Sequence, residues 1–502
     1  MSSSQAPPAS GAAAALDSQR AGRGFLFITT AKLYFMLAGA VIEFVLPHLF
    51  PADESARLFG LYKVTVGIVS VINNVMITVT IQSVSKFVAE DDAQQGQVAR
   101  AGFRLMALIG IVTAGTFAAV APLLSGFEHD AALTPYLRIS AAVVVAYSIY
   151  SVFVGIANGR REFHKQAGLD MTFSTLRAAG VLGLAAAGLG VGGAVGGFAA
   201  AAVAIGFVAA LVVRVPPRGG GPAFPAARLA GFFGQVGLYT LLLNLLLWVG
   251  LFLLKRYTPD QPKLPGYYAA AQTLSVLSYQ AIIAVIFVIF PLISRATFEG
   301  DAERARAYVG HAMRNSLLLA TLFGVTLAAR PAELLRVPYP ADFAAGAVCL
   351  RALGLGFVAF SMLAVAGAIL NGAGKTGAAL ATVGGTLAVA VAANVAVVPG
   401  ANDPLRAAAV ATAGAMGFGL LLSALFLRRH FGSFVPLASL LRVVLAGAAG
   451  LAAGMLMPAR GKLVTLLELA VVALVYVATL VITREIGRAD LASVQRVMRG
   501  RS

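Results

Sequence analysis

Residues 58–90 read LFGLYKVTVGIVSVINNVMITVTIQSVSKFVAE, and a second stretch with the same order of features begins at Leu264. The second stretch reads LPGYYAAAQTLSVLSYQAIIAVIFVIFPLISRATFEG. When the two are aligned, a glycine and a tyrosine match near the start, Asn74 matches Gln280, and both copies end at a basic residue followed by acidic residues. A repeat of this length indicates that the chain is built from two related halves.

The composition excludes a soluble globular protein of ordinary kind. Of the 502 residues, 59% are hydrophobic and only 12% are charged. Apolar runs of about 20 residues, the length that a helix needs to cross a bilayer, recur from end to end. Because lipid offers no partner to an unpaired backbone group, these runs are expected to be helices. We predict an all-α integral membrane protein with about 14 transmembrane helices, on the strength of these run lengths.

The predicted spans form two lobes of six helices and an additional C-terminal pair. Because six is an even number, both copies of the repeat enter the membrane from the same side, as parallel repeats with a site between the lobes. The spans are 24–50, 60–88, 101–125, 136–158, 169–189, 191–213, 229–254, 267–293, 309–329, 345–370, 376–398, 405–427, 441–457 and 463–483. The expected domains are a disordered cytoplasmic tail (1–23), an N-terminal lobe (24–213), a Pro/Gly-rich cytoplasmic linker (214–228), a C-terminal lobe (229–428), the additional pair (441–484) and a basic cytoplasmic tail (485–502).

The formal net charge of +17 is explained by membrane topology, and nucleic acid is not needed as a partner. Loops on the N-terminal side carry about twice as many Lys and Arg residues as loops on the other side, and such a bias orients a polytopic protein. We therefore expect both termini to be cytoplasmic and the protein to lie in the inner (plasma) membrane.

Nothing in the sequence indicates catalysis or a bound metal. The single cysteine, Cys349, excludes an intramolecular disulfide, and no Cys or His spacing fits a metal site. The segment 372–376 reads GAGKT, but it lacks the four-residue interval of a phosphate-binding loop. The predicted outer loops are too short for a catalytic centre, so we expect a transporter without a cofactor.

Charged residues inside the predicted spans are candidate functional positions, because a charge at a helix centre costs about 2.5–3.5 kcal/mol on insertion scales. Lys32 and Glu43 lie on one face of the first span, about three turns apart, too far to pair. Arg177 lies in the fifth span on the face of Asp170. Two interpretations of Arg177 remain open: a cation that lines a lumen, or an arginine that reaches the interface.

A polar stripe also runs along the second span, and Thr273 and Gln280 occupy corresponding positions in the eighth. Such a stripe faces either another helix, through hydrogen bonds, or a water-filled lumen, and the pattern does not choose between them. The stripe consists of Lys63, Gly67, Ser70, Asn74, Thr78 and Ser85.

Arginines stand at matched positions near the outer ends of the fourth and tenth spans. Leu137-Arg138 precedes Asn158-Gly159, and Leu350-Arg351 precedes Asn371-Gly372. A single arginine at the membrane interface is common and indicates little about function. Arginines at matched positions of the two copies favour a shared role. Lys255 and Arg256, at the end of the seventh span, are typical of interfacial anchors.

In their order and spacing, three motifs resemble the oligosaccharide flippases of the polysaccharide-transporter family. These motifs are GLYKVTVGIVSVINNVMITVTIQSVSKFVAE, GIANGRREFHKQAGLD and AILNGAGKTGAAL. The family belongs to a superfamily that includes multidrug and toxin extruders and lipid II flippases. The resemblance implies transfer of undecaprenyl-diphosphate-linked oligosaccharide from the inner to the outer leaflet, by alternating access through a cationic lumen. It also implies that Lys32, Lys63 and Arg177 lie near the diphosphate or acidic sugars.

Two alternatives remain open: a lipid II flippase, although the arginine-rich first-span pattern is lacking, and a cation-coupled multidrug or small-solute antiporter. The expected partners are the lipid-linked glycan, membrane lipids and glycan-assembly proteins, and the protein is expected to act as a monomer. Glu43 is the candidate ion-coupling residue. The candidate substrate-binding residues are Lys32, Lys63, Asn74, Arg138, Arg177, Gln280 and Arg351.

Overall fold

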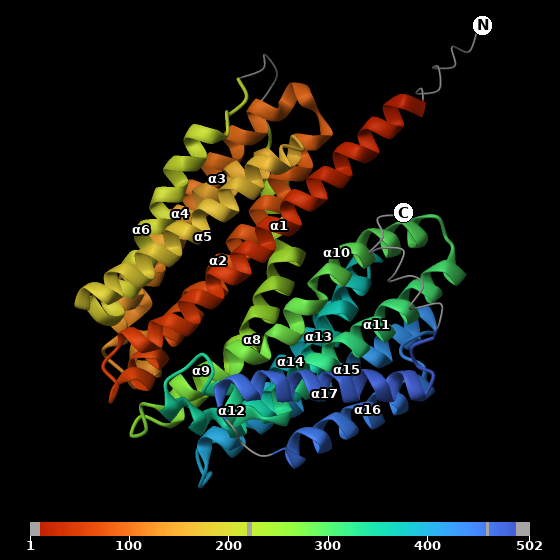
Figure 1. Cartoon of the computed structure of the whole chain (residues 1–502). Helices are drawn as coiled ribbons and strands as arrows, with labels where there is room; N and C mark the ends of the chain where they lie inside the picture. The colour runs from red at the N-terminus through yellow and green to blue at the C-terminus, as the bar shows by residue number, and fades with distance from the viewer. Residues whose placement is uncertain (1–10, 218–222, 458–460, 488–502) are drawn as a thin grey trace, which may run out of the picture. The chain divides into compact units, whose positions relative to one another are not determined.

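The computed structural model describes residues 11–217, 223–457 and 461–487, and every regular element in these ranges is helical (Figure 1). Thirteen stretches of them are long and apolar enough to cross a membrane. One of the thirteen, Phe163–Val212, is 50 residues long and contains two helices that fold back on each other. The prediction of an all-α membrane protein with about 14 spans is therefore confirmed.

The first half of the chain forms six long helices. Between the second and third, a short 3-10 turn covers Asp92–Gln94. The six helices are α1 (Gly11–Leu49), α2 (Ser55–Glu90), α3 (Gln95–Phe127), α4 (Leu133–Gly159), α5 (Phe163–Leu184) and α6 (Gly190–Val212).

The turn between α5 and α6 depends on glycine. Gly188 and Gly190 have φ values of 85° and 54°, which residues with a side chain rarely adopt. On either side of this turn, Gly180 and Gly197 bring the two backbones together, since a Cβ on Gly180 would lie 2.6 Å from the Gly197 carbonyl oxygen. The two helices are thus an antiparallel hairpin, beside which α4 also packs (Figure 1).

The second half contains eleven helices in the described residues, several of them short. A π-helical turn over Phe233–Gly237 precedes α8, and a 3-10 turn over Ala341–Gly346 precedes α13. The helices are α7 (Ala226–Ala230), α8 (Leu238–Tyr257), α9 (Leu264–Ser275), α10 (Leu277–Phe298), α11 (Ala302–Ala329), α12 (Pro331–Leu335), α13 (Ala347–Gly372), α14 (Thr376–Val397), α15 (Pro404–Phe431), α16 (Leu437–Leu456) and α17 (Lys462–Ile482).

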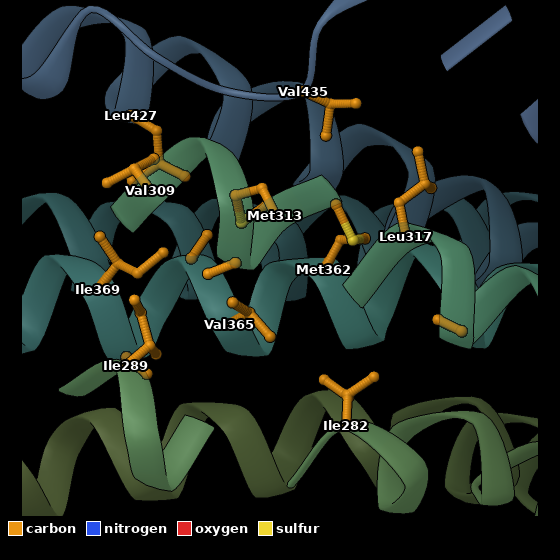
Figure 2. Close-up of a cluster of buried hydrophobic side chains, with 14 of the residues drawn as sticks. Ile282, Ile289, Val309, Met313, Leu317, Met362, Val365, Ile369, Leu427 and Val435 are labelled. Atoms are coloured by element: carbon orange, nitrogen blue, oxygen red, sulfur yellow. The ribbon is translucent and has the colours of Figure 1, made fainter. Parts of the chain in front are cut away.

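The main core of this half lies around α13. Figure 2 shows Met362, Val365 and Ile369 of α13 between side chains of α11 on one side and of α10 on the other. The buried side chains of α11 in this core include Val309 and Met313. Helices α16 and α17 pack against each other and against α11, so the additional pair is attached to this core (Figure 1).

The chain divides into two compact units. Unit 1 contains Met1–Leu46, Val69–Leu123 and Ala132–Gly237, and unit 2 contains Pro47–Ile68, Leu124–Ala131 and Leu238–Ser502. Two short segments from the first half of the sequence therefore pack with the second half. The lobes at 24–213 and 229–428 stay a prediction, since a repeat in sequence does not show which helix ends are in contact.

The ends of the chain differ in part from the expected tails. Helix α1 begins at Gly11, so the predicted disordered tail over 1–23 includes a helical part, whose Ala-rich run at 12–15 has high helix propensity. Residues 1–10, and residues 488–502 of the predicted basic tail, lie outside the described ranges.

Candidate functional site

Lys32 of α1 forms an ion pair with Asp170 of α5. The Lys32 Nζ donates a hydrogen bond to the Asp170 Oδ2 at 2.9 Å, and the side chains are 49% and 15% exposed, respectively. A second contact, between the hydroxyls of Tyr34 and Thr175 at 2.7 Å, holds the same two helices together. Lys32 therefore has a fixed counterion but remains accessible.

Arg177 lies two helical turns beyond Asp170 on the same face of α5. Its guanidinium carbon is 4.7 Å from the ring centroid of Phe198 on α6, a cation–π geometry. Between the two charges, the Ser174 hydroxyl donates to the backbone carbonyl of Asp170, so the serine supports the helix. Arg177 is half-buried in unit 1 and packs on an aromatic ring.

Aromatic rings surround these charges. Phe35 stacks on Phe173 with centroids 6.4 Å apart, and Tyr147 contacts Phe173 edge-on at 5.3 Å and Phe198 at 6.2 Å. We call the charged group and these rings the Lys32 cluster. It consists of Lys32, Asp170 and Arg177 with Phe35, Tyr147, Phe173 and Phe198, and its formal charge is one positive unit.

Lys63 lies in unit 2 and has a different environment. It is 7% exposed, donates to the Thr273 Oγ1 at 3.2 Å, and its Nζ is 5.4 Å from the ring centroid of Trp248. A Cβ on Gly67 would lie 2.7 Å from the Trp248 Cε3, so Gly67 leaves room for the indole. At this end, the polar stripe contacts α8 and α9.

The remaining predicted residues are more accessible. Asn74 is exposed on α2, and Gln280 of α10 and Glu43 of α1 are half-buried. Arg138 is exposed in the second turn of α4. Arg351, at the matched position of α13, is also exposed, and its Nε is 3.4 Å from the carbonyl oxygen of Ala328.

The two copies of the repeat meet at their aligned glycines. A Cβ on Gly60 would lie 2.7 Å from the backbone nitrogen of Gly266, and a Cβ on Gly266 would overlap the carbonyl oxygen of Ala56. The aligned tyrosines, Tyr62 and Tyr268, are both buried. The starts of α2 and α9 thus use equivalent surfaces against each other, as related halves do about a two-fold axis.

Lys255 and Arg256 are not simple interfacial anchors. The Lys255 Nζ is 2.6 Å from the Asp130 Oδ2, and the lysine side chain is only 7% exposed. Arg256 donates to the carbonyl of Phe127 at 2.6 Å and lies 4.0 Å from the centroid of its ring. Both residues bind the segment that follows α3, which a hydropathy pattern could not show.

Glu128 is buried beside this ion pair. Burial raises its pKa to about 8, although the positive charges of Lys255 and Arg256 lower it; Asp130 adds to the increase. Neither Glu128 nor Asp130 is among the residues predicted from the sequence. The sequence feature that could have identified these acids is the run Glu128-His129-Asp130 between two spans. Its negative charges are opposite to the positive charges of Lys255 and Arg256 near the end of α8.

The fold belongs to a class of known transporters. A structure described as the lipid II flippase MurJ in an inward closed conformation has a TM-score of 0.74 and 12% identity, and the match covers 92% of this chain and 99% of that chain. An inward-facing MATE-family multidrug resistance transporter of the MOP superfamily has a TM-score of 0.63 and 18% identity, with 80% and 94% covered. For a MOP-superfamily transporter from Pyrococcus furiosus the TM-score is 0.58, with 18% identity and 82% and 93% covered. The chain therefore shares its fold with these solved structures.

The family follows from a sequence profile. The profile of the family described as polysaccharide biosynthesis protein matches residues 57–343, more than half of the chain and both copies of the repeat. The chain belongs to this family. A search of curated protein sequences found no match.

Proposed function

We propose that this protein is a flippase that transfers an undecaprenyl-diphosphate-linked oligosaccharide from the inner to the outer leaflet of the plasma membrane. The family and the fold support a transporter in polysaccharide assembly. The observation that carries the assignment of substrate class is the Lys32 cluster, in which two cations lie beside one carboxylate and several aromatic rings.

A diphosphate cannot cross hydrocarbon without fixed positive charges to replace its hydration. The Lys32 ammonium is half exposed, so it can exchange the Asp170 carboxylate for a phosphate oxygen. Arg177 provides a second, planar donor two turns further along α5. Asp170 then competes with the diphosphate for Lys32, which keeps binding weak enough for release.

The aromatic rings suit the sugar part of the substrate. The apolar faces of sugar rings pack on aromatic side chains, and the tyrosine hydroxyl can also form hydrogen bonds with the sugar. Phe35, Phe173 and Tyr147 lie within one group of contacts beside the charges. The prenyl tail needs no protein cavity, because it is as apolar as the lipid.

Alternating access requires that contacts at one end of the molecule open. In unit 2 the ends of α2 and α3 are held against α8 and α9 by the Gly60–Gly266 contact, the Lys63–Thr273 hydrogen bond and the Lys255–Asp130 ion pair. We call these three contacts the closure. In the proposed cycle the closure breaks when the site opens to the other leaflet, which exposes Lys63.

The proposal is tested by reconstitution in vesicles with a fluorescent undecaprenyl-diphosphate oligosaccharide and a membrane-impermeant quencher. We expect Lys32→Gln and Arg177→Gln each to reduce the initial flipping rate about tenfold, the size expected for loss of a charge-assisted hydrogen bond. The matched control is Lys165→Gln, which breaks the ion pair with Glu162 at 3.0 Å in the first turn of the same helix α5. Wild-type rates in both cluster variants would contradict the assigned site.

Lipid II is a second candidate substrate, because the fold likeness covers 99% of a chain described as a lipid II flippase. Lipid II has the same diphosphate and prenyl groups, so the Lys32 cluster suits both. Competition separates them: unlabelled lipid II should slow transfer of the labelled oligosaccharide less than the unlabelled oligosaccharide does. The reverse order would make lipid II the substrate.

A further inference from the structure

A cavity of about 690 Å³ lies in unit 2 at the end of the bundle where α11 and α16 end and α13 and α15 begin. It is separate from the Lys32 cluster and from the closure, and none of its residues belongs to either. Five charged residues line it: Arg330, Glu333, Arg351, Asp403 and Arg406.

Arg330 provides buried donors on the wall of this cavity. The residue is 7% exposed, and its Nη2 is 3.4 Å from a carboxylate oxygen of both Glu333 and Glu468. At these distances the charges form ion pairs but no hydrogen bonds. The Nε and Nη2 atoms of Arg330 are buried and have no hydrogen-bond partner in the structure. A third nitrogen, Nη1, donates to the carbonyl of Met457. The Arg330 guanidinium is thus a buried positive charge at the wall of the cavity.

The rim of the cavity carries both signs of charge. Arg351 and Arg406 are exposed, each near the start of its helix. Asp403 caps α15 by accepting from the backbone nitrogen of Arg406 at 3.0 Å, and it is exposed as well. Three arginines and two carboxylates therefore line one cavity, which suits a headgroup that itself carries both charges.

Below the charges the walls are apolar and face the surroundings. Leu355 lies one turn below Arg351 on α13, and Val410 lies one turn below Arg406 on α15. Leu355 and Val410 are 42% and 54% exposed, and Met455 of α16 lines the opposite wall with 59% exposure. Charges at the helix ends with apolar grooves beneath them match the layout of a phospholipid.

We propose that this cavity binds one glycerophospholipid with an amine headgroup, phosphatidylethanolamine. Arg351 and Arg406 bind the phosphate, Arg330 adds a buried positive charge behind them, and the Asp403 and Glu333 carboxylates receive the ammonium. The acyl chains lie over Leu355 and Val410, against Met455. An anionic lipid without an amine would bring no cation to these two carboxylates, which makes the zwitterionic headgroup the better fit. The bound lipid joins α13 and α15 to α16.

The test is native mass spectrometry of the delipidated, purified full-length protein with added lipid. Phosphatidylethanolamine should bind as one tight equivalent, phosphatidylglycerol about tenfold more weakly, and inorganic phosphate not detectably. The double variant Arg351→Gln/Arg406→Gln should lose at least about tenfold in affinity for phosphatidylethanolamine. Leu355→Trp fills the groove without changing charge, and it should lower the same affinity. The matched control, Arg336→Gln, removes an exposed arginine at the same end of the bundle that does not line the cavity.

Equal affinity for both phospholipids would overturn the proposal. So would wild-type binding in both the double variant and Leu355→Trp, or binding of inorganic phosphate alone. Preferential binding of undecaprenyl-diphosphate oligosaccharide at this cavity would also overturn it. Monodisperse elution of each variant shows that it is folded. If the double variant does not fold, the Leu355→Trp affinity decides the question, because that residue faces outward and carries no charge.

Discussion

Lys32 and Lys63 have the same side chain in two different settings. Lys32 is half exposed and paired with a carboxylate, whereas Lys63 is buried between a threonine hydroxyl and an indole ring. A half-exposed ammonium can exchange partners, while a buried one must first be uncovered. In the proposed cycle Lys32 thus belongs to the site in the described conformation, and Lys63 contributes only after the closure opens.

In the proposed cycle, Glu128 is expected to make the closure sensitive to pH, because its carboxyl leaves its buried position when the closure opens. Because its pKa is about 8 when the carboxyl is buried and falls to the ordinary range when the closure opens, the closed form binds more protons. The closed form is therefore disfavoured progressively as pH rises from the ordinary carboxyl pKa to about 8, and falling pH favours closure. The groups that face Glu128 are Lys255, Arg256 and Asp130.

Replacement of Glu128 by Gln should abolish this dependence. The assay uses a Lys63→Cys variant and measures the rate at which a maleimide labels the new cysteine. The rate is corrected for the pH dependence of thiolate formation, which is measured on the unfolded protein. With Glu128 present, the corrected rate should increase from pH 6 to pH 8. In the Glu128→Gln background the corrected rate should stay low and flat. The only native cysteine, Cys349, is buried and should not interfere. A persistent pH slope in the Gln variant would contradict the role of Glu128.

At the residue scale, sequence reasoning found charges but not their partners. Lys32, Glu43 and Arg177 were identified because ionisable groups are costly inside spans. Asp170 was noted only as sharing a face with Arg177, since nothing in the sequence shows that α1 lies against α5. For the same reason Lys255 looked like an anchor until its contact with Asp130 was seen.

The starts of α2 and α9 approach closely because both carry glycine. Gly266→Val should force these helices apart, with an overpacking cost of about 1–3 kcal/mol to the closed form. The predicted result is faster labelling of the cysteine at position 63 than in the parent. Gly115→Val is the control, because nothing lies within 4 Å of a Cβ at that position. Equal labelling in the two valine variants would show that the glycine contact does not hold the closure.

Helices α16 and α17 are fastened by Glu485. Its carboxylate accepts from the Arg314 Nε at 2.7 Å and the Arg442 Nη1 at 3.1 Å, and its side chain is 2% exposed. Although burial opposes ionisation, the hydrogen bonds from Arg314, Ser439 and Arg442 hold the pKa of Glu485 below its usual range. The attachment is thus present at neutral pH and weakens as pH falls through this lowered pKa.

Glu485→Gln should lower stability by about 3–5 kcal/mol, because it leaves two arginines without their shared anion. A lowered Tm in detergent, together with earlier proteolysis between α15 and α16, would report the detachment. Glu303→Gln, in the exposed first turn of α11, should leave both measurements unchanged. An unchanged Tm in Glu485→Gln would mean that apolar packing alone fastens the pair.

At the element scale, run length predicted the helices well, because a bilayer imposes both length and backbone pairing. The division of 169–189 from 191–213 was confirmed as the α5–α6 hairpin, and its physical basis is the positive φ of Gly188 and Gly190. The distortion at Val276, where α9 ends and α10 follows, was not predicted. The run 267–293 carries no proline or glycine near the break.

At the scale of the whole molecule, the two lobes inferred from the repeat stay a prediction, because a repeat does not show which helix ends are in contact. The segments Pro47–Ile68 and Leu124–Ala131 belong to unit 2 although they come from the first half. The assignments of Asn74, Gln280, Arg138, Arg351 and Glu43 to substrate or ion coupling remain predictions.

The flippase assignment is tested most directly by locating lipid-linked oligosaccharide in cells depleted of this protein. Right-side-out spheroplasts are probed with a lectin that cannot cross the membrane, before and after permeabilisation. We predict that the glycan accumulates in the inner leaflet, where the lectin reaches it only after permeabilisation, and that wild-type protein but not Lys32→Gln/Arg177→Gln restores access. Glycan equally accessible in depleted and undepleted spheroplasts would contradict the assignment.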